Sequence, residues 1–200
     1  EGFEDALYGA YSTLSASALY GEYLSWGLLD VFAQYYKKSS INDNVKSMLI
    51  LEHEKLRSYY NSIWNKGYES IGYVNNVLRN LERKSENSMH YYKLYKGEAL
   101  GLRANLHFDL LRLFAPHVGS KPNAQGIPYV TIYEVAVSPF RTVSEVYDLV
   151  IKDLKEAELL LQEDETLLVY PRKFVLNDGF ATCREIHFNL YAAQALLARV

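Results

Sequence analysis

Residues 97–119 read GEALGLRANLHFDLLRLFAPHVG, a stretch with the spacing of a long helix that carries two apolar stripes. At about 100° per residue, the second stripe lies about 140° from the first, so we expect neighbouring helices on both sides. The first stripe consists of Ala99, Leu102, Leu106, Leu110 and Leu113, and the second of Leu100, Ala104, Phe108, Leu111 and Ala115. A separate polar arc is expected to face water, and it consists of Glu98, Gly101, Asn105, Asp109 and Arg112.

Arg103 and His107 fall in the gap between the two stripes, where a sandwiched helix is partly buried. A buried guanidinium group needs a carboxylate or several carbonyl oxygens, because an unpaired charge is costly to remove from water. Asp30, in the otherwise apolar run LLDVFA, is the expected partner. We interpret Arg103, His107 and Asp30 as a structural clamp between helices, and a ligand site at the same residues is the alternative.

Helical spacing dominates the rest of the chain, and strand alternation is scarce. The opening helix extends back to about residue 88 and is stopped by Pro116. Other helices are predicted over residues 3–18, 56–83, 142–162 and 183–200. Two of these starts have the spacing of a capping box, Thr142 with Glu145 and Thr182 with Glu185.

The long helices are expected to form consecutive antiparallel pairs, 56–83 with 88–115 and 142–162 with 183–200. This pairing predicts an all-α fold of irregular tetratricopeptide-like hairpins, an α-solenoid. A long Pro- and Gly-rich loop crossing connects the third and fourth long helices. We expect residues 1–200 to form a single domain that is a fragment of a longer chain, because neither end has a helix start or stop signal.

Composition and motifs weigh against several functional classes. A net charge of -3 and a pI near 6.0 give no basic field for nucleic acid. Cys183 is the single cysteine, so neither a disulfide framework nor a cysteine-based zinc site is expected. The sequence has no GxGxxG, P-loop or GxSxG motif, and HEKLR at 53–57 lacks the second His of a zinc protease. We interpret the acidic run 163–165 as the solvated end of a helix. We therefore predict no enzyme, no catalytic residues, no cofactor and no metal site.

Several segments follow one another in a fixed order along the chain. They are ALYGAYSTL (6–14), WNKGYESIGYVNNVL (64–78), GEALGLRANLHFDLLRLFA (97–115), GIPYV (126–130), RT followed by VSEVYDLVIKDLKEAELLL (141–161), and NLYAAQALLARV (189–200). In this order they resemble the N-terminal half of the SusD/RagB-like family. The similarity covers nearly the whole chain and departs from the family pattern in residues 19–55 and around SKPNAQ (120–125).

The resemblance implies a function. Members of this family are helical lipoproteins on the outer face of the outer membrane in Bacteroidetes-type bacteria, and they are not enzymes. Each covers a TonB-dependent barrel transporter and captures glycans, or in some cases peptides, for import. The resemblance therefore predicts a glycan-binding subunit that delivers oligosaccharides to such a transporter and is held by an N-terminal lipid anchor outside this chain. The segment 126–140 has more apolar residues than a free loop should, and packing on its own helices is the first interpretation; our hypothesis is that part of this segment, or the helix beside it, faces the barrel.

The 18 Tyr residues suit a glycan site. A sugar ring presents flat C–H faces to aromatic rings and hydroxyl groups to amides and carboxylates. Residues 20–45 combine these residue types with a polar turn, so composition and loop context, with no family residue transferred, predict that the ligand contacts Trp26, Tyr35, Tyr36, Asn42, Asp43 and Asn44. The alternative is that these aromatic rings fill helix interfaces.

Two other functions stay open. A tetratricopeptide-type adaptor would hold a protein peptide in a concave groove, and Asn75, Asn76 and Arg79 along one helix are suitable backbone clamps. A hydrolase would need two carboxylates, or a nucleophile and a base, that converge in a pocket.

Overall fold

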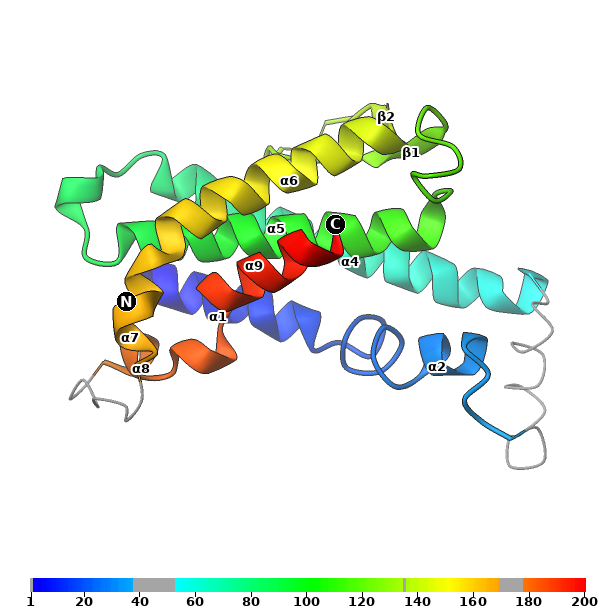
Figure 1. Ribbon diagram of the computed structural model, residues 1–200, viewed down its shortest axis with the longest axis horizontal. Helices are drawn as coiled ribbons and strands as arrows, with labels where there is room; N and C mark the ends of the chain where they lie inside the picture. Colours follow the sequence, from blue (N-terminus) through cyan, green and yellow to red (C-terminus); the bar gives the residue numbers. More distant parts are fainter. Residues whose placement is uncertain (1, 38–52, 135, 170–177) are drawn as a thin grey trace. The chain divides into compact units, whose positions relative to one another are not determined.

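The computed structural model describes residues 2–37, 53–134, 136–169 and 178–200 (Figure 1). The elements are mostly helices, which confirms the predicted helical class, and a small sheet is added. The helices are α1 (Gly2–Leu14), α2 (Leu28–Phe32), α4 (His53–Leu81), α5 (Tyr92–Phe114), α6 (Val143–Leu160), α7 (Asp164–Leu167), α8 (Gly179–Thr182) and α9 (Leu190–Arg199). The strands are β1 (Gln125–Pro128) and β2 (Phe140–Thr142), and short 3-10 turns cover Glu86–Ser88, Leu161–Glu163 and Arg184–Ile186.

The chain divides into two compact units. The small unit is formed by residues 9–70, and the main unit by residues 1–8 and 71–200. The small unit contains the second half of α1, all of α2 and the first part of α4. The main unit contains the end of α4 together with α5, α6 and α9. The expectation of a single domain over residues 1–200 stays a prediction.

Helix α5 forms the centre of the main unit. It packs against α6, and α6 packs in turn against α9 (Figure 1). Both predicted stripes are buried over most of their length, at Ala99, Leu100, Leu102, Ala104, Leu106, Phe108, Leu110 and Leu111. Burying one Leu or Phe side chain stabilises a fold by about 1.5–3 kcal/mol, so these two stripes supply much of the core.

Part of the predicted polar arc of α5 does not face water. Glu98 is fully buried, and a Cβ placed on Gly101 would lie 2.0 Å from Cε1 of Phe188. Arg184 Nη1 donates to Glu98 Oε2, and His187 Nδ1 donates to Glu98 Oε1 at 2.7 Å. The prediction for Glu98 and Gly101 was wrong because residues 184–188 cover this side of α5 and bring the positive charge that a buried carboxylate needs.

Asp164 is a second acidic residue that the sequence pattern misplaced. It was expected to be solvated within the run 163–165, and it is fully buried. Its carboxylate accepts from Arg184 Nε at 2.7 Å and Nη2 at 3.1 Å, and from the backbone N–H of Leu190 at 3.0 Å. Arg184 therefore joins α5, α7 and the start of α9 through two buried carboxylates, and this cluster has a structural role.

Of the two predicted capping boxes, one is confirmed and one is wrong. Helix α6 begins after the predicted capping box, in which Thr142 Oγ1 accepts from the Glu145 N–H at 3.2 Å and Glu145 Oε2 accepts from the Thr142 N–H at 2.7 Å. The last helix does not begin with the box at Thr182 and Glu185. It begins at Leu190, where the side chain of Asn189 accepts from the N–H of Ala192.

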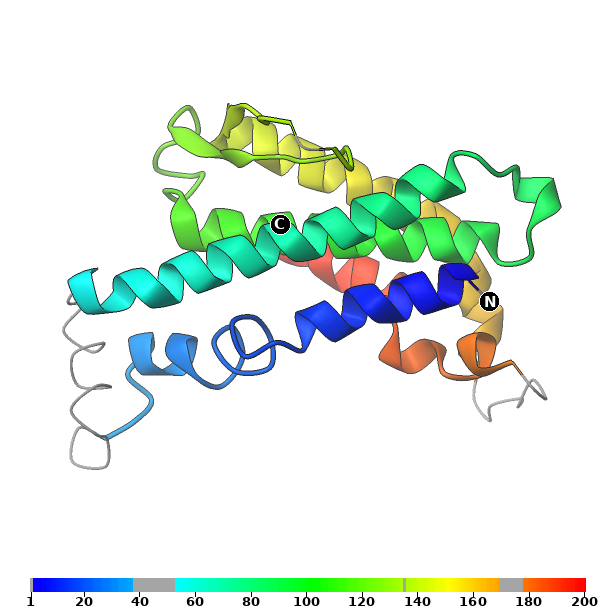
Figure 2. The same cartoon turned by 180° about the vertical axis from the view of Figure 1, so that it is seen from behind.

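The crossing between α5 and α6, residues 115–142, is more ordered than the predicted loop. Strands β1 and β2 pair antiparallel, with Gln125 opposite Thr142 and Pro128 opposite Phe140. Gly126 permits this pairing, because a Cβ there would lie 3.1 Å from the backbone oxygen of Arg141. Figure 2 shows the crossing from behind.

Among the helices that the structure describes, none combines the length and the apolar character needed to cross a bilayer.

Candidate ligand-binding site

Arg103 lies in a buried ion pair at the centre of the main unit. Its Nε and Nη2 donate to the two carboxylate oxygens of Asp153 on α6, at 2.7 and 2.9 Å, and its Nη1 donates to Asn75 Oδ1 on α4 at 3.2 Å. The guanidinium group therefore joins three helices. The carboxylate partner is Asp153 and not Asp30, so that part of the predicted clamp was wrong. Asp30 lies on α2, a helix of the small unit.

Tyr129 extends this ion pair into the crossing. Its hydroxyl donates to Asp153 Oδ2 at 2.6 Å, and its ring stacks on His107 with the ring centroids 3.9 Å apart. Burial, followed by the charge of Asp153, raises the pKa of Tyr129, so the hydroxyl keeps its proton and acts as a donor. Asp153 thus accepts hydrogen bonds from both Arg103 and Tyr129.

His107 holds the backbone of the crossing. Its Nε2 accepts from the N–H of Val130 at 2.9 Å, so the ring carries its proton on Nδ1 and donates to the carbonyl oxygen of Arg103 at 2.8 Å. Burial is the main cause that lowers the pKa of His107 to about 3; the hydrogen bond to the Arg103 carbonyl opposes this shift and the nearby charge of Arg103 adds to it. His107 is therefore neutral and serves as a fixed hydrogen-bonding link between α5 and the crossing.

Helix α4 binds the same stretch of backbone. Asn75 Nδ2 donates to the carbonyl oxygen of Val130 at 2.9 Å, and Arg79 Nη1 donates to the carbonyl oxygen of Tyr133 at 3.4 Å. The Arg79 guanidinium also lies over the ring of Tyr133, 4.7 Å from its centroid, and donates to Asn76 Oδ1 at 3.0 Å. The residues considered as clamps for a foreign peptide therefore hold the chain's own crossing.

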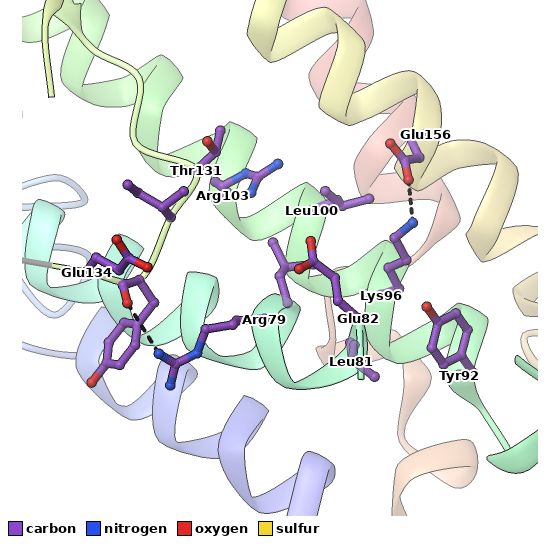
Figure 3. A pocket seen from close by; sticks show the side chains of 13 residues that line it. Arg79, Leu81, Glu82, Tyr92, Lys96, Leu100, Arg103, Thr131, Glu134 and Glu156 are labelled. Atoms are coloured by element: carbon purple, nitrogen blue, oxygen red, sulfur yellow. Dashed lines mark hydrogen bonds and ion pairs between the residues drawn. The ribbon is translucent and has the colours of Figure 1, made fainter. Parts of the chain in front are cut away.

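A pocket of about 360 Å³ opens beside the crossing in the main unit (Figure 3). This volume lies within the range of about 300–1,000 Å³ that is usual for small-ligand sites. Aliphatic side chains of α4 and α5 form part of the wall, and the charged side chains that line it include Arg79, Glu82, Lys96, Glu134 and Glu156. Lys96 Nζ donates to Glu156 Oε1 at 2.7 Å. Sequence reasoning missed this pocket because its walls come from four separate segments.

The aromatic residues predicted to bind ligand lie in the small unit. Trp26, Tyr35 and Tyr36 are 60%, 79% and 42% exposed. The Tyr36 hydroxyl donates to the carbonyl oxygen of Trp26 at 2.8 Å, and Trp26 Nε1 donates to that of Gly21 at 3.1 Å. Gln34 has a φ of 58°, a left-handed conformation that turns the chain directly after α2 and before Tyr35.

Of the predicted ligand residues, the polar ones cannot be placed. Asn42, Asp43 and Asn44 lie outside the described residues. Whether Trp26, Tyr35 and Tyr36 contact a ligand stays a prediction. Within the described ranges, no three His, Cys, Asp or Glu side chains are grouped so that they could hold a metal ion.

The fold is similar to that of solved proteins from Bacteroides. A proposed sugar-binding protein from Bacteroides vulgatus matches with a TM-score of 0.69 at 25% identity, over 98% of this chain and 41% of that one. A SusD superfamily protein from Bacteroides thetaiotaomicron has a TM-score of 0.67 at 23% identity, over 99% of this chain and 41% of that one. A SusD-like carbohydrate-binding protein from Bacteroides vulgatus has a TM-score of 0.69 at 20% identity, over 99% of this chain and 40% of that one.

The chain spans about two fifths of the length of these proteins. No curated protein is significantly similar to it in sequence. The sequence model of the SusD-like family, described as "Starch-binding associating with outer membrane", matches residues 10–200. This match runs over nearly the whole chain, confirms the resemblance seen in the ordered motifs, and shows that the chain belongs to the SusD-like family.

Proposed function

We propose that this chain is the N-terminal part of a cell-surface protein that captures glycans and delivers oligosaccharides to a TonB-dependent outer-membrane transporter. Membership of the SusD-like family over residues 10–200 carries the proposal. The sugar- and carbohydrate-binding descriptions of two structural relatives support it. In the full-length protein we expect an N-terminal lipid anchor that holds it at the outer face of the outer membrane. The role is binding without catalysis, as the family resemblance implies.

The exposed aromatic residues of the small unit suit the proposed glycan site. Trp26, Tyr35 and Tyr36 leave a large aromatic surface open to solvent in a short stretch of chain. Sugar C–H faces stack on such rings, while the ring N–H and hydroxyl groups retain polar contacts. The hydrogen bond from Tyr36 to the Trp26 backbone fixes the two segments relative to each other, so less ordering entropy is lost when a ligand binds.

A glycan array on the full-length protein, followed by titration with the best glycan, tests this assignment. Each lost aromatic contact of about 1.5 kcal/mol weakens binding about tenfold, so Trp26→Ala and the double variant Tyr35→Ala/Tyr36→Ala should each lose about tenfold or more in affinity. Tyr191→Ala is the matched control, because Tyr191 is 54% exposed and lies on α9, outside the proposed site. Unchanged affinity in both aromatic variants would show that Trp26, Tyr35 and Tyr36 do not contact the glycan.

The proposed contact with the transporter uses the crossing. Ile132, Tyr133, Val137 and Phe140 are 49%, 41%, 99% and 53% exposed, which is more apolar surface than a loop usually leaves in water. Val137→Glu should reduce co-purification of the full-length protein with the barrel, because it places a charge in an apolar contact. Leu159→Glu, at a position on α6 that is 69% exposed, should leave co-purification unchanged. An intact complex in the Val137 variant would show that the transporter does not contact the crossing at this residue.

The adaptor alternative has less support. An adaptor of the tetratricopeptide type needs free side chains in its groove to bind the backbone of a foreign peptide. Asn75 and Arg79 instead bind the backbone of Val130 and Tyr133, so a second extended segment would have to displace the crossing first.

A further inference from the structure

The cations around the pocket beside the crossing are all engaged. Lys96 is paired with Glu156 at 2.7 Å. Arg79 donates to the carbonyl oxygen of Tyr133 and covers the face of the same ring at 4.7 Å. Arg103, at the inner end, is held by its bidentate ion pair with α6. Each of these three groups therefore already has a partner, although Arg79 Nε is a buried donor without one among the described residues.

Two carboxylates of the same pocket are available. Glu82, at the end of α4, and Glu134, in the crossing, both line it (Figure 3). Within the part of the chain that the structure describes, neither carboxylate has a hydrogen bond or an ion pair. With Asp153 counted as the partner of Arg103, four carboxylates face three cations around this pocket. The pocket therefore attracts positive charge.

The rest of the wall is suited to the stem of a long side chain. Ile132, which is 49% exposed, contributes accessible aliphatic surface, Leu81 and Leu100 are buried in the wall, and the ring of Tyr92 stands at the edge of the pocket (Figure 3). A Lys or Arg side chain packs its methylene groups on apolar surface while its charged end reaches polar groups, and an aromatic face adds attraction for the cation. A sugar ring is less well served here, because Arg79 already covers the face of Tyr133.

We propose that this pocket receives a Lys or Arg side chain of a partner protein that docks beside the crossing. The ammonium or guanidinium group lies between Glu82 and Glu134, and its stem packs on Ile132 and the ring of Tyr92. This site goes beyond the capture of glycans, which the proposed function assigns to the small unit. It is also smaller than an adaptor groove, because it takes one side chain and leaves the crossing in place.

The test uses the full-length protein and blocked tripeptides with Lys, Arg, norleucine or Glu at the central position, titrated by NMR. The Lys and Arg peptides should bind, and norleucine, which keeps the stem but not the charge, should bind at least about fivefold more weakly, equivalent to about 1 kcal/mol for one exposed ion pair. Glu82→Gln and Glu134→Gln should each lower the affinity for the Lys peptide about fivefold. Raising NaCl from about 50 mM to about 500 mM should also lower the affinity of the unchanged protein for this peptide.

Glu165→Gln is the matched control, because this exposed glutamate lies on α7, away from the pocket, and should leave the affinity unchanged. Circular dichroism on each variant should show the same helical signal as the unchanged protein. Equal binding of the norleucine and Lys peptides, equal binding by the double glutamine variant, or no binding of the Lys peptide would each overturn the proposal. Binding of glucosamine at Glu82 and Glu134 in place of the Lys peptide would also overturn it. The glycan array on the double variant should be unchanged, so this test is independent of glycan capture.

Discussion

Replacing Asp153 by Asn tests the buried ion pair on which the main unit depends. The substitution keeps the size and shape of the side chain and removes its charge. The Arg103 side chain is only 10% exposed, and its guanidinium group has then lost the carboxylate that neutralised it. Tyr129, whose hydroxyl donates to Asp153 Oδ2 at 2.6 Å, also loses a charged acceptor.

The expected loss follows from these contacts. Breaking a buried ion pair by removing one partner costs about 3–5 kcal/mol, because the other charge stays buried. Weakening the Tyr129 hydrogen bond adds up to about 1–3 kcal/mol. We therefore expect Asp153→Asn to lower the free energy of unfolding by at least about 3 kcal/mol. Replacing the whole group with apolar residues, as Arg103→Met/Asp153→Leu/Tyr129→Phe, should recover most of this loss, because no buried charge is left.

Urea unfolding followed by far-UV circular dichroism measures these differences, with the free energy in water taken by linear extrapolation. Glu54→Gln is the control. Glu54 pairs with Arg57 at 3.7 Å, and both side chains are more than 70% exposed, so this pair should contribute less than about 0.5 kcal/mol. If Asp153→Asn lowers the free energy of unfolding by less than about 1 kcal/mol, water solvates Arg103, and the ion pair does not act as a buried link between the helices.

Three further predictions concern other contacts. As pH falls from 7 to 5, His107 becomes protonated in the unfolded chain but stays neutral in the folded protein, where its pKa is about 3. The free energy of unfolding should therefore fall by about 2 kcal/mol through this residue. His107→Gln should show a correspondingly shallower pH dependence in urea unfolding, and an identical slope would contradict the assignment. Gly101→Ala should destabilise by about 1–3 kcal/mol in calorimetry, because its Cβ would overlap the ring of Phe188, whereas Gly72→Ala, with nothing within 4 Å, should stabilise by about 0.5–1 kcal/mol; shifts of the same sign would contradict this. Thr142→Ala should cost about 0.5–2 kcal/mol through loss of the α6 cap, and Thr142→Ser, which keeps the hydroxyl, should cost less.

The sequence predicted the helices well where a local pattern determines them. The two stripes of 97–119 require partners on both sides of α5, and the box at Thr142 and Glu145 satisfies its own backbone groups, so neither depends on distant residues. The predicted start of the last helix was wrong because it does depend on distant residues. Residues 183–186 have helical spacing, but Arg184 is drawn into ion pairs with Glu98 and Asp164, and the continuous helix begins only at Leu190.

The partner of Arg103 shows what local patterns leave undetermined. Periodicity identifies a polar residue on a buried face, but several carboxylates in the chain could reach it, and Asp30 was chosen because its neighbours are apolar. Asp153 carried the same signal. It lies three residues after Val150 and four before Ala157 on the inner stripe of α6, where all three are buried. A search for acidic residues on every apolar stripe would have found it.

The surface features depend on tertiary structure to different degrees. Trp26, Tyr35 and Tyr36 could be proposed from loop context, because a turn rich in polar residues rarely lies inside a core. The pocket with Glu82 and Glu134 could not, since these residues come together only when the crossing folds back onto α4. No spacing along the chain predicts that approach.

The crossing is fastened by main-chain atoms. Val130 is held through its own N–H and carbonyl, and Tyr133 through its carbonyl, by side chains that belong to α4 and α5. Amide and carbonyl groups are the same in every amino acid except proline, so this route survives most exchanges of the outward residues 131–134. New side chains could therefore be grafted at residues 131–134 at little cost in folding free energy, while the path of the backbone stays constant.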